Sequence, residues 1–195
     1  MVLLKNGHSD VNTDDASTRL EYLAEAEADL VRMLDTVSAK ADISDYTDLP
    51  EGQSLIHQAW AGDMVAAQWY FPKGTEDKDV LRYWTPKQGE AVGNDLITAL
   101  AGGNNPVLAH LFMNFMLDYE MSMVNFQWNG YLPPQSAVDP ESLIRGSGAP
   151  YSVVQPSLIS TLVTEADFGK GVQLLELSPE VDARWKDVWE VFGTA

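Results

Sequence analysis

The sequence predicts an α/β protein, because strand-like and helix-like stretches alternate along its 195 residues. The strand-like stretches are short and apolar, and they are bounded by Gly, Pro, Asn and Asp, which favour turns. The helix-like stretches carry apolar residues three and four positions apart, which places those residues on one helix face. The chain contains no internal repeat and no clear linker.

One long helix is expected in the first fifth of the chain. Residues 2–5 have the pattern of a helix end, and the Asn-Gly pair at 6–7 closes it. Residues 12–15, Asn-Thr-Asp-Asp, supply side-chain oxygens that cap the N-terminus of the next helix. That helix is amphipathic, and its apolar stripe consists of Leu20, Leu23, Leu30, Val31 and Leu34.

Three short strands are expected in the middle of the chain. Residues 54–60, Ser-Leu-Ile-His-Gln-Ala-Trp, predict the first, and a short helix over 64–70 follows it. Residues 79–84 and 95–100 predict the second and third, with a turn-rich Pro-Lys-Gln-Gly-Glu loop between them. Strands separated by helices in this way favour the α/β class.

Three helices are expected further along. An Asn-Pro pair at 105–106 is a strong helix start, because Asn caps the helix and Pro fits its first turn. A second helix is expected over 119–129, and a last one over 178–193. The expected inward faces are Leu108, Leu111, Phe112 and Phe115 in the first of these helices, and Val181, Trp185, Val188, Trp189 and Phe192 in the last.

Composition limits the function classes. The formal net charge of −17 disfavours binding to nucleic acid, where Lys and Arg must neutralise phosphates, and it disfavours anionic membranes. It favours cationic ligands, although an acidic surface can also have no role beyond keeping the protein soluble. No cysteine is present, so disulfides and thiolate chemistry are excluded. No apolar run reaches the ~20 residues that cross a bilayer, and no signal-peptide pattern is present.

Catalytic motifs are absent from the sequence. It contains no Gly-x-Ser-x-Gly, no phosphate-binding Gly loop and no His pair at metal-ligand spacing. Asp63 and Asp95 could act as a pair of carboxyl groups in a hydrolytic site, but nothing nearby in the sequence indicates an acid with a raised pKa. We therefore expect no enzyme activity.

Aromatic and acidic residues gather where the predicted strands end. Trp60 ends the first strand and Asp63 opens the following helix, and the other members of the set lie at strand ends and in loops further along: Trp84, Asp95, Trp128 and Tyr131. Aromatic faces attract cations, and carboxylates form charge-assisted hydrogen bonds with ammonium groups. In an open α/β sheet, ligands bind beyond the carboxyl ends of the strands. An alternative reading is open: Trp60 could be a core residue and Asp63 a helix cap.

Five short motifs occur in the order found in one family. Residues 58–63 (Gln-Ala-Trp-Ala-Gly-Asp), 83–89 (Tyr-Trp-Thr-Pro-Lys-Gln-Gly) and 93–95 (Gly-Asn-Asp) come first. The Asn-Pro helix over 105–118 and residues 129–135 (Asn-Gly-Tyr-Leu-Pro-Pro-Gln) follow. In this order they resemble the extracellular solute-binding proteins of polyamine (spermidine/putrescine)-type ABC transporters. One departure is Gly93, where such proteins usually carry an aromatic residue.

The resemblance implies a type II periplasmic-binding-protein-like fold with two lobes that close on the ligand. Residues 1–195 would be the C-terminal portion of such a protein: most of one lobe, with segments returning to the other. Because family members are longer, a truncated chain without the N-terminal lobe is expected. By the family pattern, Trp60 would stack on the aliphatic chain of the ligand and Tyr131 would offer its ring and hydroxyl. Asp63 and Asp95 would bind ammonium groups.

The resemblance also implies partners and a compartment. The ligand would be spermidine, putrescine or a related cationic amine, and the partner a membrane-embedded ABC permease. The full-length protein would be periplasmic or lie on the extracellular cell surface, and no metal, no cofactor and no membrane insertion by this chain are expected. The alternative is a sensor or interaction module on the same fold with a ligand other than a polyamine, because a fold does not determine function.

Overall fold

The described chain is helical and contains no β-sheet. The computed structural model describes residues 2–8, 11–12, 15–75, 79–163, 169 and 171–194. Within these ranges α-helices and 3₁₀-helices are joined by irregular segments, and β pairing is limited to two isolated parallel bridges, Ala91 with Val172 and Ile144 with Val154. The prediction of an α/β, type II periplasmic-binding-protein-like fold is therefore wrong.

None of the three predicted strands pairs with another. Residues 54–60, 79–84 and 95–100 belong to no β-ladder in the part of the chain that the structure describes. A strand is stable only when a neighbour satisfies its backbone N–H and C=O groups, and alternating apolar residues predict a buried face but no partner. Leu100 is accordingly 80% exposed, although Leu81 is buried.

The chain divides into two compact units, which we describe separately. Unit 1 comprises residues 1–42, 85–94 and 165–195, and unit 2 comprises residues 43–84 and 95–164. The expectation that the chain forms most of one lobe with segments returning to another stays a prediction.

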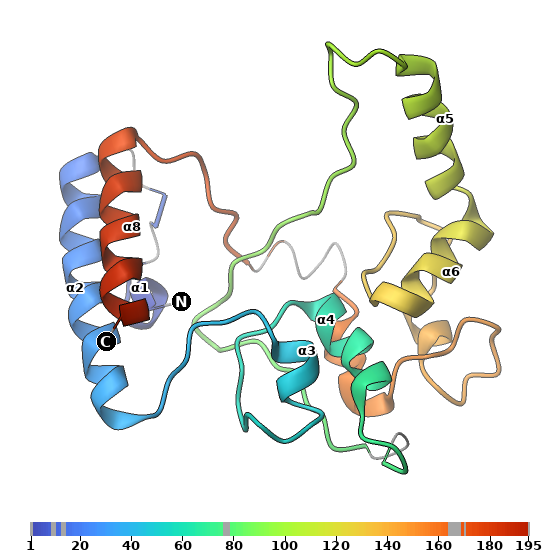
Figure 1. The fold of residues 1–195 in the computed structure, drawn as a ribbon, viewed down its shortest axis with the longest axis horizontal. Helices are drawn as coiled ribbons and strands as arrows, with labels where there is room; N and C mark the ends of the chain where they lie inside the picture. The colour runs from blue at the N-terminus through green and yellow to red at the C-terminus, as the bar shows by residue number, and fades with distance from the viewer. Residues whose placement is uncertain are drawn as a thin grey trace. The chain divides into compact units, whose positions relative to one another are not determined.

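Unit 1 is built around two helices. α2 (Ala16–Thr36) and α8 (Pro179–Thr194) lie side by side, and the short α1 (Val2–Lys5) packs against α2 (Figure 1). The two long helices confirm the sequence prediction. Their small core consists of Leu23, Val181 and Val188, with Leu30 and Leu177 partly buried against it.

The tryptophans of α8 do not face inward as expected. Val181 and Val188 are two turns apart and share one face of the helix, which meets α2. Trp189 lies about 80° around the helix axis from Val181 at 100° per residue, so it falls beside the contact. Trp185 and Trp189 are both exposed.

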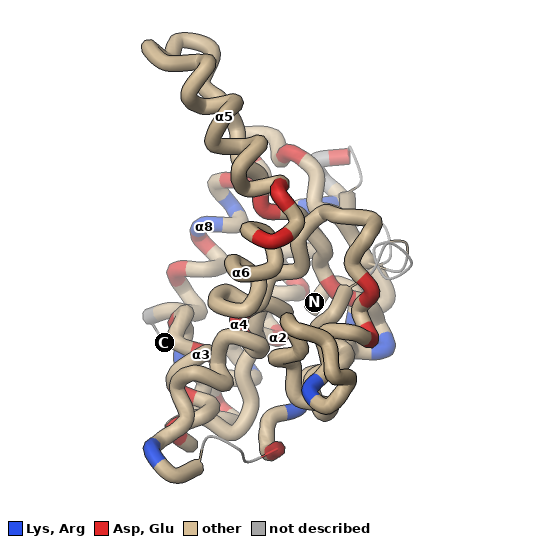
Figure 2. Tube along the Cα trace, turned by 90° about the vertical axis from the view of Figure 1, so that its right-hand side faces the viewer, with Lys and Arg blue, Asp and Glu red and all other residues tan. Residues whose placement is uncertain are grey.

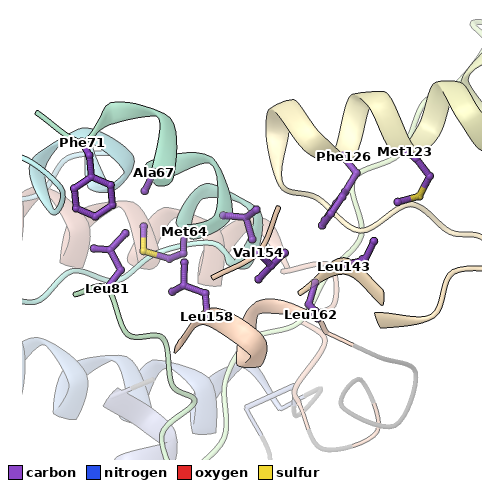
Figure 3. Close-up of a cluster of buried hydrophobic side chains, with 11 residues drawn as sticks. Met64, Ala67, Phe71, Leu81, Met123, Phe126, Leu143, Val154, Leu158 and Leu162 are labelled. Atoms are coloured by element: carbon purple, nitrogen blue, oxygen red, sulfur yellow. The ribbon is translucent and has the colours of Figure 1, made fainter. Parts of the chain in front are cut away.

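Unit 2 contains the larger core. Its helical segments are α3 (Asp45–Asp48), α4 (Ala61–Ala66), η1 (Ala67–Tyr70), α5 (Pro106–Met116), α6 (Tyr119–Asn129), η2 (Pro140–Leu143) and η3 (Pro156–Thr161). α4 contacts α6, η3 and α3. The buried side chains between these elements (Figure 3) are those of Met64, Val65, Ala67, Phe71, Leu81, Met123, Phe126, Leu143, Val154, Leu158 and Leu162.

α5 and α6 differ in burial although both confirm the predicted helices. α6 buries Met123 and Phe126 and ends at Gly130, whose left-handed backbone (φ 76°) closes the helix. α5 buries no residue, so its apolar stripe, which was expected to face a core, is exposed. Within the described ranges, no helix combines the length and apolar character needed to cross a membrane.

Candidate ligand-binding site

Two glycines bring the end of α6 against the start of α4. A Cβ atom at Gly130 would lie 2.2 Å from the carbonyl oxygen of Gly62, and the positive φ of Gly130 also disfavours other residues. A Cβ atom at Gly62 would lie 2.3 Å from Cδ2 of Tyr131. Because neither glycine has a side chain, the ring of Tyr131 lies directly on the first turn of α4.

This contact pairs Tyr131 with Asp63. The Tyr131 hydroxyl donates a hydrogen bond of 2.9 Å to Oδ1 of Asp63, between positions 68 residues apart in the sequence. Burial raises the pKa of the Asp63 carboxyl, the hydrogen bond from Tyr131 opposes this, and the charge of Asp95 adds to the rise. Burial and the hydrogen bond to Asp63 also raise the pKa of the Tyr131 hydroxyl, so it stays a neutral donor.

The pair lies in the wall of a small aromatic pocket. The pocket has a volume of about 190 Å³, below the ~300 Å³ at which sites for drug-sized ligands begin. Trp69 is held in place because its Nε1–H donates to the carbonyl oxygen of Gln127 at 3.2 Å. The residues lining the pocket are Tyr46, Asp63, Ala66, Trp69, Tyr70, Trp128, Asn129 and Tyr131.

A second carboxyl group lies next to the pocket wall. Asp45 precedes the pocket residue Tyr46, and Tyr46 meets Tyr70 edge to face at 5.2 Å between ring centroids. Asp45 is 1% exposed, and neither of its carboxyl oxygens has a hydrogen-bond partner among the described residues. Burial, followed by the charge of Asp63, raises the pKa of Asp45 to about 6, while the charge of His57 and the nearby backbone N–H groups of Asp45 and Tyr46, which do not reach hydrogen-bond geometry, oppose the rise.

Three of the four predicted site residues come together. Asp63 and Tyr131 are hydrogen bonded, and Asp95 is near enough for its charge to act on both. Trp60 does not join them: it is the N-cap residue of α4, is 60% exposed and does not line the pocket. Asp63 lies inside α4 and not at its cap, so neither the helix-cap reading of Asp63 nor the core reading of Trp60 is correct.

Several pocket residues carried no recognisable signal in the sequence. Trp69 and Tyr70 follow α4 directly, and only the turn of η1 brings them to the pocket. Asp45 and Tyr46 lie in a stretch that reads as polar loop. Trp128, by contrast, was among the aromatic candidates of the sequence and directly precedes the motif at 129–135, and it does line the pocket.

A larger hollow, about 320 Å³, lies on α8 between Trp185, Lys186, Trp189 and Glu190. These four residues belong to one helix and are all exposed, so they form a surface groove without the buried polar groups of the pocket in unit 2. Across the described ranges, no cluster of three or more His, Asp or Glu side chains is arranged to hold a metal ion.

The pocket in unit 2 therefore combines a largely aromatic wall with one carboxylate held by a phenol, and the buried Asp45 carboxyl precedes one of its lining residues, Tyr46. Such a site can surround a small cation, because π faces and carboxylates both stabilise positive charge. Comparison with known proteins adds no relative: no family model, no curated protein and no solved structure matches the chain.

Proposed function

We propose that the pocket of unit 2 binds a small organic cation that carries ammonium groups. One observation carries the proposal: the Asp63 carboxylate, which accepts a hydrogen bond from the Tyr131 hydroxyl, lies in the wall of a pocket that is lined mainly by aromatic side chains. An ammonium group that binds beside Asp63 loses water, and a charge-assisted hydrogen bond to the Asp63 carboxylate would compensate for that loss. The faces of Trp69 and Trp128 would add about 0.5–2 kcal/mol each where water is displaced.

Spermidine or putrescine is the proposed ligand class, and capture for an ABC importer is the proposed role. This step rests on the ordered motifs at 58–63, 83–89, 93–95, 105–118 and 129–135, since the expected fold is absent. The proposed partner is a membrane-embedded permease, and the proposed compartment is the periplasm or the outer cell surface. No catalytic step is proposed.

A sensor or interaction module is the second candidate function. The exposed apolar face of α5 favours it, because exposed apolar patches commonly mark sites of protein contact. Under this proposal the pocket would still bind a cation, and the response to binding would be a protein contact and not transport. An adjacent permease gene would favour the transport role.

Titration calorimetry of the chain with spermidine and with a neutral diol of similar length tests the amine proposal. Asp63→Asn keeps the shape of the side chain and removes its charge. Losing one partner of a buried charged pair costs ~2–5 kcal/mol, so the spermidine affinity should fall more than tenfold. The matched control is Glu120→Gln on the exposed surface of α6, which removes the same charge outside the pocket. It should change the affinity less than twofold.

Two results would contradict the proposal. One is equal affinity of the wild type and Asp63→Asn for spermidine. The other is binding of the neutral diol as tightly as the amine, which would show that the pocket selects shape and not charge.

A further inference from the structure

Asp45 is a buried carboxyl group that the proposed ammonium contacts do not use. Both of its oxygens are buried and lack a hydrogen-bond partner in the described ranges. A buried polar group without a partner is costly and uncommon in folded proteins, so each one calls for an explanation, of which a functional site is one. The position of Asp45 indicates such a site, because the next residue, Tyr46, lines the amine pocket.

Two neighbouring charges act on Asp45 in opposite directions. Asp63 on α4 opposes its ionisation, whereas His57, in the segment before α4, favours it. The charge of Asp45 also acts on the Tyr131 hydroxyl, so its field reaches the pocket wall. The other titratable side chains on α3, and on the elements packed against it, are those of Tyr46, Asp48 and Tyr70.

We propose that Asp45 is the proton-exchanging group of the pocket: in mildly acidic solution it holds a proton while the pocket is empty and releases it when an ammonium group binds beside Asp63. This inference rests on the amine-binding function proposed above. The carboxyl group loses its proton to the solvent and becomes a carboxylate, and the positive charge of the ligand replaces the positive charge of the proton. The released proton offsets the charge of that one ammonium group, and the further ammonium groups of a polyamine add to the charge of the complex.

The physical reason is the low polarity around Asp45. A carboxylate that has lost its water is stabilised when a cation approaches, and the ionised form then becomes the favoured one. The pKa of about 6 in the empty pocket supports this exchange, because it places the loss of the proton between mildly acidic and neutral pH. Asp45 acts through its charge and need not touch the ligand.

The test is calorimetry with spermidine near pH 5 and near pH 7.5, each in two buffers that differ in ionisation enthalpy. With the wild type, about one proton should be released per spermidine near pH 5 and almost none near pH 7.5. The affinity near pH 5 should be about tenfold lower than near pH 7.5. Asp45→Asn cannot titrate at this position and should lose both effects.

Asp63→Asn is the matched variant, because it removes the other carboxyl and leaves Asp45 able to exchange its proton. It should bind more weakly at both pH values and still release a proton near pH 5, although in smaller amount, because burial still raises the pKa of Asp45 but the charge of Asp63 no longer does. Unchanged proton release by the Asp45→Asn variant would overturn the inference about Asp45 and leave the amine proposal standing. Absence of spermidine binding to the wild type would overturn both.

Carboxyl carbon NMR follows the titration of the aspartates in the wild-type chain, so this test does not require any variant to fold. The wild-type chain, labelled at aspartate carboxyl carbons, is titrated with acid alone and with saturating spermidine. One buried carboxyl should titrate near pH 6 in the free protein and about two units lower, or more, with spermidine. A titration unchanged by spermidine would overturn the inference.

Discussion

The direction of the Tyr131 side chain depends on two residues without side chains. Gly130 ends α6 with a positive φ, and Gly62 leaves room for the Tyr131 ring on α4. The hydrogen bond to Asp63 follows from that placement, since the hydroxyl is held over the first turn of the helix. The short Trp-Ala-Gly-Asp segment therefore contributes a carboxylate and also the space that its phenol partner requires.

Gly62→Ala should disturb this arrangement specifically. The new Cβ atom would lie 2.3 Å from the Tyr131 ring, so the ring must move away and the hydrogen bond to Asp63 must lengthen. Overpacking of this kind costs ~1–3 kcal/mol in the free energy of unfolding. Urea denaturation measures that loss, and the spermidine affinity should fall with it.

Gly102→Ala is the control for this change, because a Cβ atom at Gly102 meets nothing within 4 Å and its φ is not positive. It should leave both the unfolding free energy and the affinity nearly unchanged. Equal effects of the two substitutions would mean that the close contact with Tyr131 does not hold the site together.

Sequence reasoning at the residue scale identified the polar residues of the site better than the aromatic ones. Asp63, Asp95 and Tyr131 were predicted together, because the ordered motifs contain them. Trp60 was predicted as the stacking residue from the family motif, but as the N-cap residue of α4 it is 60% exposed and does not line the pocket, whereas Trp128 does. No sequence pattern predicted the burial of Asp45, because that burial arises from the packing of α3 against α4 and η1.

At the scale of elements, the helices were predictable and the sheet was not. Caps, helix-starting prolines and spacing of three and four are local signals, and they predicted α2, α5, α6 and α8 correctly. A sheet depends on partners distant in the sequence, which apolar alternation does not identify. The same limit applies to α5, since its stripe predicted a helix but not whether another element would cover it.

The contrast between α5 and α6 predicts opposite results for two phenylalanines. Phe126 on α6 is 0% exposed and lies in the core of unit 2, whereas Phe115 on α5 is 54% exposed. Phe126→Ala should cost ~3–5 kcal/mol in the free energy of unfolding, because it removes a core ring and leaves a cavity. Phe115→Ala should cost less than about 1 kcal/mol.

Urea denaturation of both variants at the same protein concentration measures these losses. The helices have the same length of 11 residues and the substitutions are identical, so each variant controls for the other. A loss above 3 kcal/mol for Phe115→Ala would show that its side chain is covered in solution, and the exposed face of α5 would then be an interface.

For the whole molecule, the dominant property is its charge. The sequence has 29 acidic residues and 12 basic residues, and the helices of both units carry them. Among the α-helices of the described ranges, α5 is the exception, since it contains no Lys, Arg, Asp or Glu (Figure 2). A net charge this far from zero repels itself and attracts cations over a long range.

Added salt should therefore affect stability and amine binding in opposite directions. Raising the ionic strength from about 10 mM to about 150 mM shortens the screening length from ~30 Å to ~8 Å. Repulsion among the acidic side chains then weakens. A resulting gain of roughly 1 kcal/mol in the free energy of unfolding would raise Tm by about 2–4 °C for a chain of this size. The same screening weakens the attraction of a polyvalent amine, so the affinity for spermidine should fall.

Calorimetry in NaCl and in KCl at equal ionic strength measures both quantities, and the two salts should agree because screening does not distinguish them. A fall in Tm with salt would mean that specific ion pairs, such as Lys5 with Asp29 at 3.0 Å, contribute more than the general repulsion.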